Sequence, residues 1–168
     1  IKPNKRKKMT IQIGDTLPEG SFNIMLDDKP SEIDTGDLFG NKNILLFAVP
    51  GAFTPGCSLN HLPGFISNRS ELYSKGIDQI VCLAVNDIFV MSAWAKSQNI
   101  SNEIMMISDG NCDYTKKIGL EIDSTAFGMG IRSRRYALVA NDSKITQLFI
   151  DEPGKIELST AESVLSNL

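Results

Sequence analysis

The feature that most constrains the fold is the apolar run at residues 43–48, which is followed by a proline- and glycine-rich stretch and then by Cys57. The run has branched and aromatic side chains without polar alternation, which is typical of a strand buried on both faces of a sheet. Pro50, Gly51 and Pro55 predict a tight turn after the strand. We therefore expect a helix to begin near Cys57.

This helix is expected to span residues 57–75, with a kink or irregular turn at Pro63-Gly64. Its inner stripe can be built from five apolar side chains: Leu59, Leu62, Phe65, Ile66 and Leu72. First-turn amides have no intrahelical acceptor, and the positive end of the helix dipole favours a thiolate over a thiol. Cys57 is therefore predicted to be reactive.

A helix terminus alone does not ionise a thiol at neutral pH. Lowering a thiol pKa from about 8.5 to roughly 6 takes about 3.4 kcal/mol, whereas a helix terminus supplies about 0.3 to 2 kcal/mol. A fixed cation is needed, and the arginine-dense stretch offers Arg132, Arg134 and Arg135. Because Arg135 precedes a second buried strand at residues 136–140, where an unpaired charge is costly, we expect it to face an anion.

These residues carry a family resemblance. Pro50, Thr54 and Cys57 fit the pattern P-x-x-x-[T/S]-x-x-C, and the chain resembles peroxiredoxins of the type II, or Prx5, subfamily. Further matches follow in order and cover nearly all of residues 9–168: HLPGF at 61–65, VND at 85–87, Ala93-Trp94, SDG at 108–110 and GIRSRRY at 130–136. The resemblance implies an α/β thioredoxin-like fold, with a central mixed sheet flanked by helices. It also implies a thiol-dependent peroxidase that reduces hydrogen peroxide and small organic hydroperoxides.

The resemblance also implies the roles of four residues. Cys57 is the peroxidatic cysteine, whose thiolate attacks a peroxide oxygen and becomes a sulfenic acid. Thr54 is expected to exchange hydrogen bonds with the peroxide and the sulfur, and Arg135 to stabilise the thiolate and the leaving oxygen. Pro50 is expected to shield the site from water. Gly56 departs from the Thr or Val that is commoner in this position.

The resemblance leaves the recycling step open. Cys82, inside a predicted strand at residues 79–85, matches the place of a resolving cysteine in plant-like type II enzymes, but it also reads as a small buried hydrophobe. If Cys82 is inert, an external thiol such as glutathione, glutaredoxin or thioredoxin must reduce the sulfenic acid. Cys112 matches no family cysteine and is expected to be a surface or loop thiol. The resemblance implies a homodimer and no cofactor.

Some of these residues also fit other roles. His61, four residues after Cys57, could tune the thiol or act as a base, but local packing or hydrogen bonding is favoured, because an arginine-stabilised thiolate needs no base. Residues 51–58 resemble a phosphate loop that lacks its lysine, and no clustered spacing of Cys and His indicates a metal site. Trp94 and Phe127 fit either core packing or a pocket rim and dimer contact. The alternative function is a redox-sensing or chaperone-like interaction protein that uses the same cysteine.

Composition fits one compact domain at residues 9–168. With 42% hydrophobic residues and a net charge of −3, the chain can build a core and lacks the basic surface that nucleic acids require. It has no apolar run of about 18 residues, the length a membrane-spanning helix needs. Three cysteines favour a reducing compartment, here the cytoplasm. Residues 1–8 read as a basic leader or vector-derived tail before Met9; if they are the remnant of a transit peptide, an organelle matrix is the alternative.

The predicted order of elements agrees with the resemblance. Strands are expected at residues 22–26, 43–48, 79–85 and 103–108, with helices at 57–75, 88–98 and 114–119. A hairpin turn at 141–144 is expected to join strands 136–140 and 145–150, and Ser159 with Glu162 predicts a capping box for a last helix. Alternating strands and helices followed by a hairpin and a helix is the thioredoxin-like order.

Overall fold

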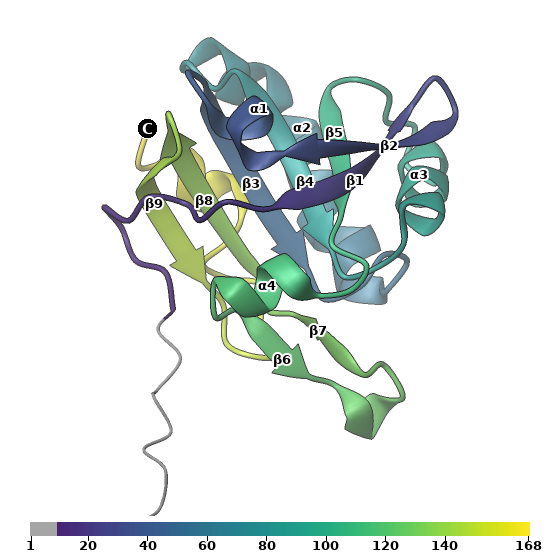
Figure 1. The fold of residues 1–168 in the computed structure, drawn as a ribbon. Helices are drawn as coiled ribbons and strands as arrows, with labels where there is room; N and C mark the ends of the chain where they lie inside the picture. The colour runs from purple at the N-terminus through teal and green to yellow at the C-terminus, as the bar shows by residue number, and fades with distance from the viewer. Residues whose placement is uncertain (1–9) are drawn as a thin grey trace, which may run out of the picture.

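The computed structural model describes residues 10–168, so the prediction of a leader before Met9 lies outside the described residues. Its centre is a seven-stranded sheet in the order β2-β1-β5-β4-β3-β8-β9 (Figure 1). The strands are β1 (Ser21–Leu26), β2 (Lys29–Asp34), β3 (Asn43–Val49), β4 (Gln79–Ala84), β5 (Ile104–Ser108), β8 (Tyr136–Asn141) and β9 (Lys144–Ile150). A separate two-stranded ribbon joins β6 (Glu121–Asp123) and β7 (Ile131–Ser133). The helices are α1 (Thr35–Phe39), η1 (Cys57–His61), α2 (Leu62–Ser74), α3 (Ile88–Ser97), α4 (Asp113–Lys117), η2 (Thr125–Phe127) and α5 (Ala161–Leu165).

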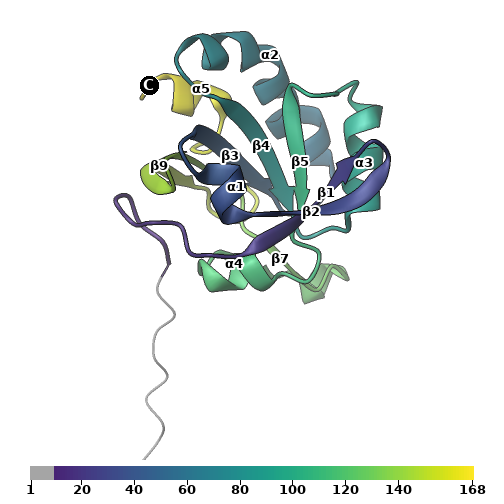
Figure 2. The ribbon, with the colours of Figure 1, turned by 45° about the horizontal axis from the view of Figure 1, so that its top comes forward.

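The sheet is mixed, as predicted. Strands β3, β4 and β5 are parallel, while β1, β8 and β9 run antiparallel to their neighbours. Every residue of β3 after Asn43 is buried, which confirms that this run is a strand covered on both faces. One core holds residues of α2, α3 and α5, and the other holds residues of α1 and α4 (Figures 1 and 2).

The sequence-based prediction missed several peripheral elements: β2, α1, the ribbon β6–β7 and η2. Strand β2 has the sequence KPSEID, is mostly exposed and lies at the edge of the sheet. Its pairing with β1 is made by the backbone through a two-residue turn, in which Asp27 and Asp28 both have positive φ. An edge strand of this kind has no apolar pattern from which it could be recognised.

The helix after β3 is irregular, but not where the prediction placed the kink. Helical backbone begins at Pro55, a residue suited to a first helical position because its missing N–H has no acceptor there. The segment Cys57–His61 is a π-helix, in which the N–H of Leu62 donates to the carbonyl of Cys57. Pro63 cannot donate an N–H, and its ring opposes a regular turn. The irregularity therefore falls on the turn before Pro63, which is the turn that carries Cys57 and His61.

The other predicted elements occur within a few residues of their expected limits. No helix among residues 10–168 has both the length and the apolar character needed to cross a membrane.

Candidate active site

Cys57 is held by the loop between β3 and the helix. Phe53 has a positive φ of 64°, and the Thr54 hydroxyl donates to the Gly51 carbonyl at 2.7 Å. The N–H of Ala52 donates to Asn86 Oδ1 at 2.9 Å, which fixes the loop to the segment after β4. Cys57 therefore lies in the first turn of the helix, where its side chain is fully buried.

The Thr54 hydroxyl has a defined polarity. It has one hydrogen, and the Gly51 carbonyl can only accept, so this hydrogen is engaged. The lone pairs of Thr54 Oγ1 remain for a substrate O–H. In this arrangement Thr54 offers an acceptor, whereas the family resemblance implied that it both accepts and donates.

Arg135 lies against Cys57. Strand β8 pairs antiparallel with β3, with Ala48 opposite Tyr136, so the residue before β8 lies beside the end of β3. Arg135 Nη2 donates to Cys57 Sγ at 3.3 Å. Arg135 Nη1 makes a second hydrogen bond, 2.9 Å long, to Nδ1 of His61. The guanidinium thus joins the cysteine to the only histidine in the chain.

His61 is buried, and its tautomer follows from its partners. Arginine only donates, so Nδ1 accepts, and Nε2–H donates to the Ser159 carbonyl at 2.8 Å. Burial lowers the pKa of His61 to about 4; the Arg135 charge adds to this, while the Ser159 hydrogen bond and Asp151 oppose it. His61 is therefore neutral at pH 7, with its Nδ1 lone pair occupied. Its ring packs against Phe47 and Phe65, in line with the predicted packing, but its hydrogen bonds reach residues far along the chain and are not local.

Asp151 and Ser159 complete this network, and the sequence analysis assigned neither of them to the site. Asp151, directly after β9, accepts from the backbone N–H groups of Glu157, Leu158 and Ser159 and from the Ser159 hydroxyl. Burial acts to raise the pKa of the Asp151 carboxyl, but these hydrogen bonds, led by that of the Ser159 hydroxyl, bring it below its usual value. Asp151 therefore fixes the segment that carries Ser159.

The predicted capping box was wrong. Thr160 is the N-cap of α5, and its side chain accepts from the N–H of Ser163. Ser159 is instead fully buried between Asp151 and His61. Adjacent serine and threonine residues both suit an N-cap, and the sequence does not say which one the fold buries. One sequence signal could have indicated the buried network. Asp151 is an acidic residue directly after β9, and β9 pairs with β8, the strand that begins after Arg135.

Gly56 leaves room that a residue of the C-terminal segment fills. A Cβ on Gly56 would lie 3.1 Å from Ile156 Cδ1 and 3.4 Å from Arg135 Nη2. A Thr or Val here would push against Ile156, and the glycine accommodates both neighbours. A pocket of about 190 Å³ lies next to this place and includes Pro50, Ile122, Phe127 and Arg135 in its lining.

The other two cysteines have different surroundings. Cys82 is fully buried in β4, where Phe47 and Met106 are its partners in the neighbouring strands, and it belongs to the same core as Cys57. Burial raises the pKa of the Cys82 thiol well above its ordinary value, with a further contribution from Cys57. Cys112 lies in the loop before α4, as predicted, but it is only 3% exposed and so is not a surface thiol. None of the three cysteines forms a disulfide.

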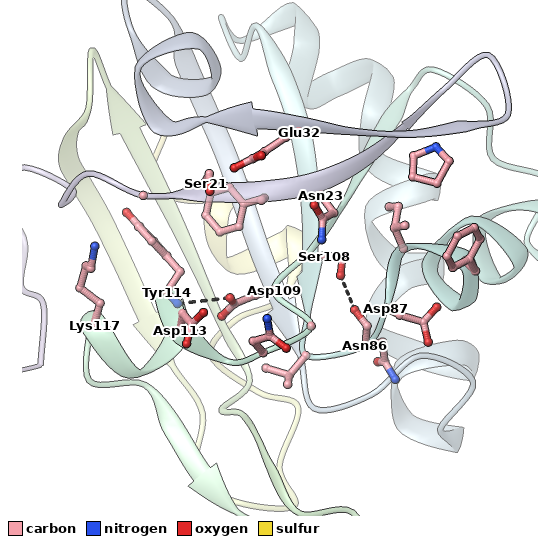
Figure 3. Close-up of a pocket in the computed structure, with 18 of the residues that line it drawn as sticks. Ser21, Asn23, Glu32, Asn86, Asp87, Ser108, Asp109, Asp113, Tyr114 and Lys117 are labelled. Carbon is pink, nitrogen blue, oxygen red and sulfur yellow. Dashed lines mark hydrogen bonds between the residues drawn. The ribbon is translucent and has the colours of Figure 1, made fainter.

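A larger pocket of about 880 Å³ lies apart from Cys57, between β1, α4 and the start of α3 (Figure 3). None of the four predicted catalytic residues lines it. Two of its carboxylates have structural partners: Asp109 accepts from the N–H groups of Tyr114 and Thr115, and Asp87 caps α3 through the N–H of Val90. Within residues 10–168, no group of three or more His, Cys, Asp or Glu side chains is placed to hold a metal ion.

The buried His61 predicts a pH-dependent stability. Its pKa is about 6.5 in an unfolded chain and about 4 in the fold, so between these values the unfolded chain binds a proton that the folded chain does not. Stability must then fall as pH falls. We expect urea unfolding at pH 5 to give a free energy about 2 kcal/mol below that at pH 7. His61→Gln should remove most of this difference, and an equal decrease in this variant would show that other groups cause it.

Comparison with known proteins agrees with this geometry. The model of the family described as Redoxin matches residues 12–165. "Peroxiredoxin-2E, chloroplastic" of Arabidopsis thaliana is 46% identical over 164 residues, which cover 95% of this chain and 70% of that protein. "Peroxiredoxin-2C" of Oryza sativa subsp. japonica is 45% identical over 159 residues, covering 94% and 98%. Reduced Prx3 from Vibrio vulnificus, crystallised in complex with hydrogen peroxide, matches with a TM-score of 0.90 and 42% identity over 94% of this chain and 99% of that chain.

The chain therefore belongs to the redoxin family, whose thioredoxin-like fold it has. Within that family it is a peroxiredoxin of the type II, Prx5-like kind, and so a thiol peroxidase. The predictions of family, fold and enzyme class are confirmed.

Proposed function

We propose that this peroxidase reduces hydrogen peroxide and small organic hydroperoxides at Cys57, with Thr54, Arg135 and Pro50 as the other residues of its active site. The observation that carries the proposal is the 3.3 Å hydrogen bond from Arg135 to the sulfur. A guanidinium in this position favours the thiolate and remains close when negative charge develops on the oxygen that leaves.

In the proposed reaction the Cys57 thiolate attacks one peroxide oxygen, the O–O bond breaks, and Cys57 becomes a sulfenic acid. The other oxygen leaves with the bonding electrons and takes a proton, giving water or an alcohol. Thr54 Oγ1 accepts from the substrate O–H and so aligns the O–O bond with the sulfur. Arg135 supplies the positive charge that the departing oxygen needs.

The surroundings of the sulfur support a preference for small peroxides. Cys57 is fully buried, which disfavours the approach of a bulky oxidant to its sulfur. The adjacent pocket of about 190 Å³ offers Pro50, Ile122 and Phe127 to a short apolar substituent. A hydroperoxide with a bulky substituent would have to displace these side chains.

For recycling, the favoured donor is an external thiol such as glutathione, glutaredoxin or thioredoxin. This thiol condenses with the sulfenic acid to a mixed disulfide and releases water, and a second thiol then restores Cys57. Cys82 is a poor resolving residue in the folded state, because it lies inside the sheet and burial raises the pKa of its thiol. To reach Cys57 it would need local opening of the core.

One equivalent of hydrogen peroxide, added to the reduced protein in a stopped-flow instrument, tests the reaction. We expect Cys57 to be oxidised orders of magnitude faster than free cysteine thiolate, because of Arg135 and Thr54. A rate no higher than that of free cysteine would contradict the peroxidase and favour a redox sensor.

Non-reducing mass analysis of the same samples, with glutathione added, identifies the recycling route. The wild type and Cys82→Ser should both form a mixed disulfide of Cys57 with glutathione. An internal disulfide between Cys57 and Cys82 in the wild type, absent in Cys82→Ser, would instead establish a two-cysteine cycle.

We also infer a homodimer, because the loop after β3, the first turn of α3 and η2 expose Phe53, Phe89 and Phe127 by 52%, 62% and 82%. The N–H of Ala52 donates to Asn86, which lies just before α3, and Arg132 in β7 donates to the Val85 carbonyl. Sedimentation analysis measures the oligomeric state. Three cysteines without a disulfide suit a reducing compartment, either the cytoplasm or an organelle matrix.

A further inference from the structure

Hydrogen bonds connect a buried carboxylate to the reactive sulfur through four links. Asp151 Oδ2 accepts from the Ser159 hydroxyl at 2.5 Å, and the Ser159 carbonyl accepts from His61 Nε2 at 2.8 Å. His61 Nδ1 accepts from Arg135, which donates to Cys57 Sγ. The chain thus runs from the end of β9, through the segment before α5, to the turn that holds the cysteine.

The imidazole in this chain is held rigidly. His61 is 2% exposed and lies edge-on to Phe47 and Phe65, with ring centroids 5.3 and 5.5 Å away. Phe47 and Phe65 are themselves stacked at 4.0 Å. The ring therefore has no room to rotate, and its Nδ1 lone pair marks a fixed point in the core. Arg135 is only half-buried, and its hydrogen bond to His61 Nδ1 fixes the orientation of its guanidinium.

The charge of each partner decides what the contact can do. A carboxylate in the place of His61 would also orient the guanidinium, but it would neutralise the positive charge that a thiolate needs. A neutral imidazole orients Arg135 and leaves its full charge to the sulfur. The carboxylate of Asp151 accepts from Ser159 and from backbone N–H groups.

We propose that His61, anchored by Ser159 and Asp151, is a positioning residue that fixes the Arg135 guanidinium against Cys57 without neutralising it. This inference deepens the proposed function and rests on it. His61 acts through Arg135 and does not touch the peroxide.

The test is a double-mutant cycle between His61 and Arg135. His61→Gln can keep a donor near Nε2 but has no acceptor at Nδ1, whereas His61→Asn places an amide oxygen close to Nδ1. We expect His61→Gln to react with hydrogen peroxide about 10-fold more slowly, within the range for partners in one hydrogen-bond network. The thiolate absorbance at pH 7 should fall with it. His61→Asn should retain most of the rate.

The Arg135→Ala background separates positioning from general loss of structure. There, His61→Gln should change the rate less than about 2-fold, because its effect requires the guanidinium. An additive effect of the two substitutions, or a loss in His61→Asn as large as in His61→Gln, would overturn the proposal. A wild-type rate in His61→Gln would also overturn it. Urea unfolding shows whether each variant is folded. An inactive wild type would refute the proposed function instead, which keeps the two failures distinct.

Discussion

Replacing Cys57 with serine is expected to abolish peroxide reduction. A serine hydroxyl at the same place does not ionise near neutral pH, and it has no sulfur on which a sulfenic acid can form. The fully buried position and the helix first turn remain, so the variant should keep its fold. Peroxide consumption with added thiol reductant should drop to the background of the reductant alone.

The matched control is Cys112→Ser, a substitution of a second buried cysteine that lies outside the site and forms no disulfide. This variant should consume peroxide at the wild-type rate. Circular dichroism and thermal unfolding of both variants show whether either substitution damages the fold. Sustained turnover by Cys57→Ser would mean that the chemistry takes place at another residue.

Arg135→Ala is expected to have the second largest effect. The substitution removes the cation at 3.3 Å from Cys57 Sγ and leaves no other charged group in hydrogen-bond contact with it among the described residues. Removing one donor that stabilises developing negative charge costs roughly 100- to 1,000-fold in rate, and we expect a loss of this size in the peroxide reaction. The fraction of Cys57 present as thiolate at pH 7, followed by its absorbance, should fall in parallel.

Arg135→Lys separates charge from geometry. A lysine keeps the positive charge, but it lacks the planar fork that bonds His61 through Nη1 and Cys57 through Nη2. We expect an intermediate rate. Full activity in Arg135→Lys would show that charge alone suffices, and full activity in Arg135→Ala would remove Arg135 from the mechanism.

The sequence was a good guide where the signal is local. Residues 43–48 are buried throughout in the fold, apart from the half-buried Asn43, because a short unbroken apolar run of branched and aromatic side chains suits a strand covered on both faces. The prolines and glycines that follow require a turn, and so Cys57 had to lie near a helix start. The irregular turn was foreseen from Pro63 but falls earlier, because proline disturbs the turn that precedes it.

Tertiary structure decided the partners of Arg135. In β9, Ile145 lies opposite Ala140 but Gln147 lies opposite Val139, so the ladder skips Thr146. The skipped residue brings Ile150 opposite Tyr136, and the N–H of Asp151 then donates to the Arg135 carbonyl at 3.0 Å. If the ladder did not skip Thr146, Ile150 and not Asp151 would lie opposite Arg135. A one-residue bulge leaves no clear mark in a hydrophobic pattern.

By itself, the sequence determined the buried strand, the cysteine at the helix start and the family, since each depends on neighbouring residues or on motifs read in order. Only the tertiary structure decided that Ser159 is buried rather than capping a helix, and that His61 bonds Arg135. These contacts join segments far apart in the chain, so strand register and core packing set them, and local propensity does not encode either.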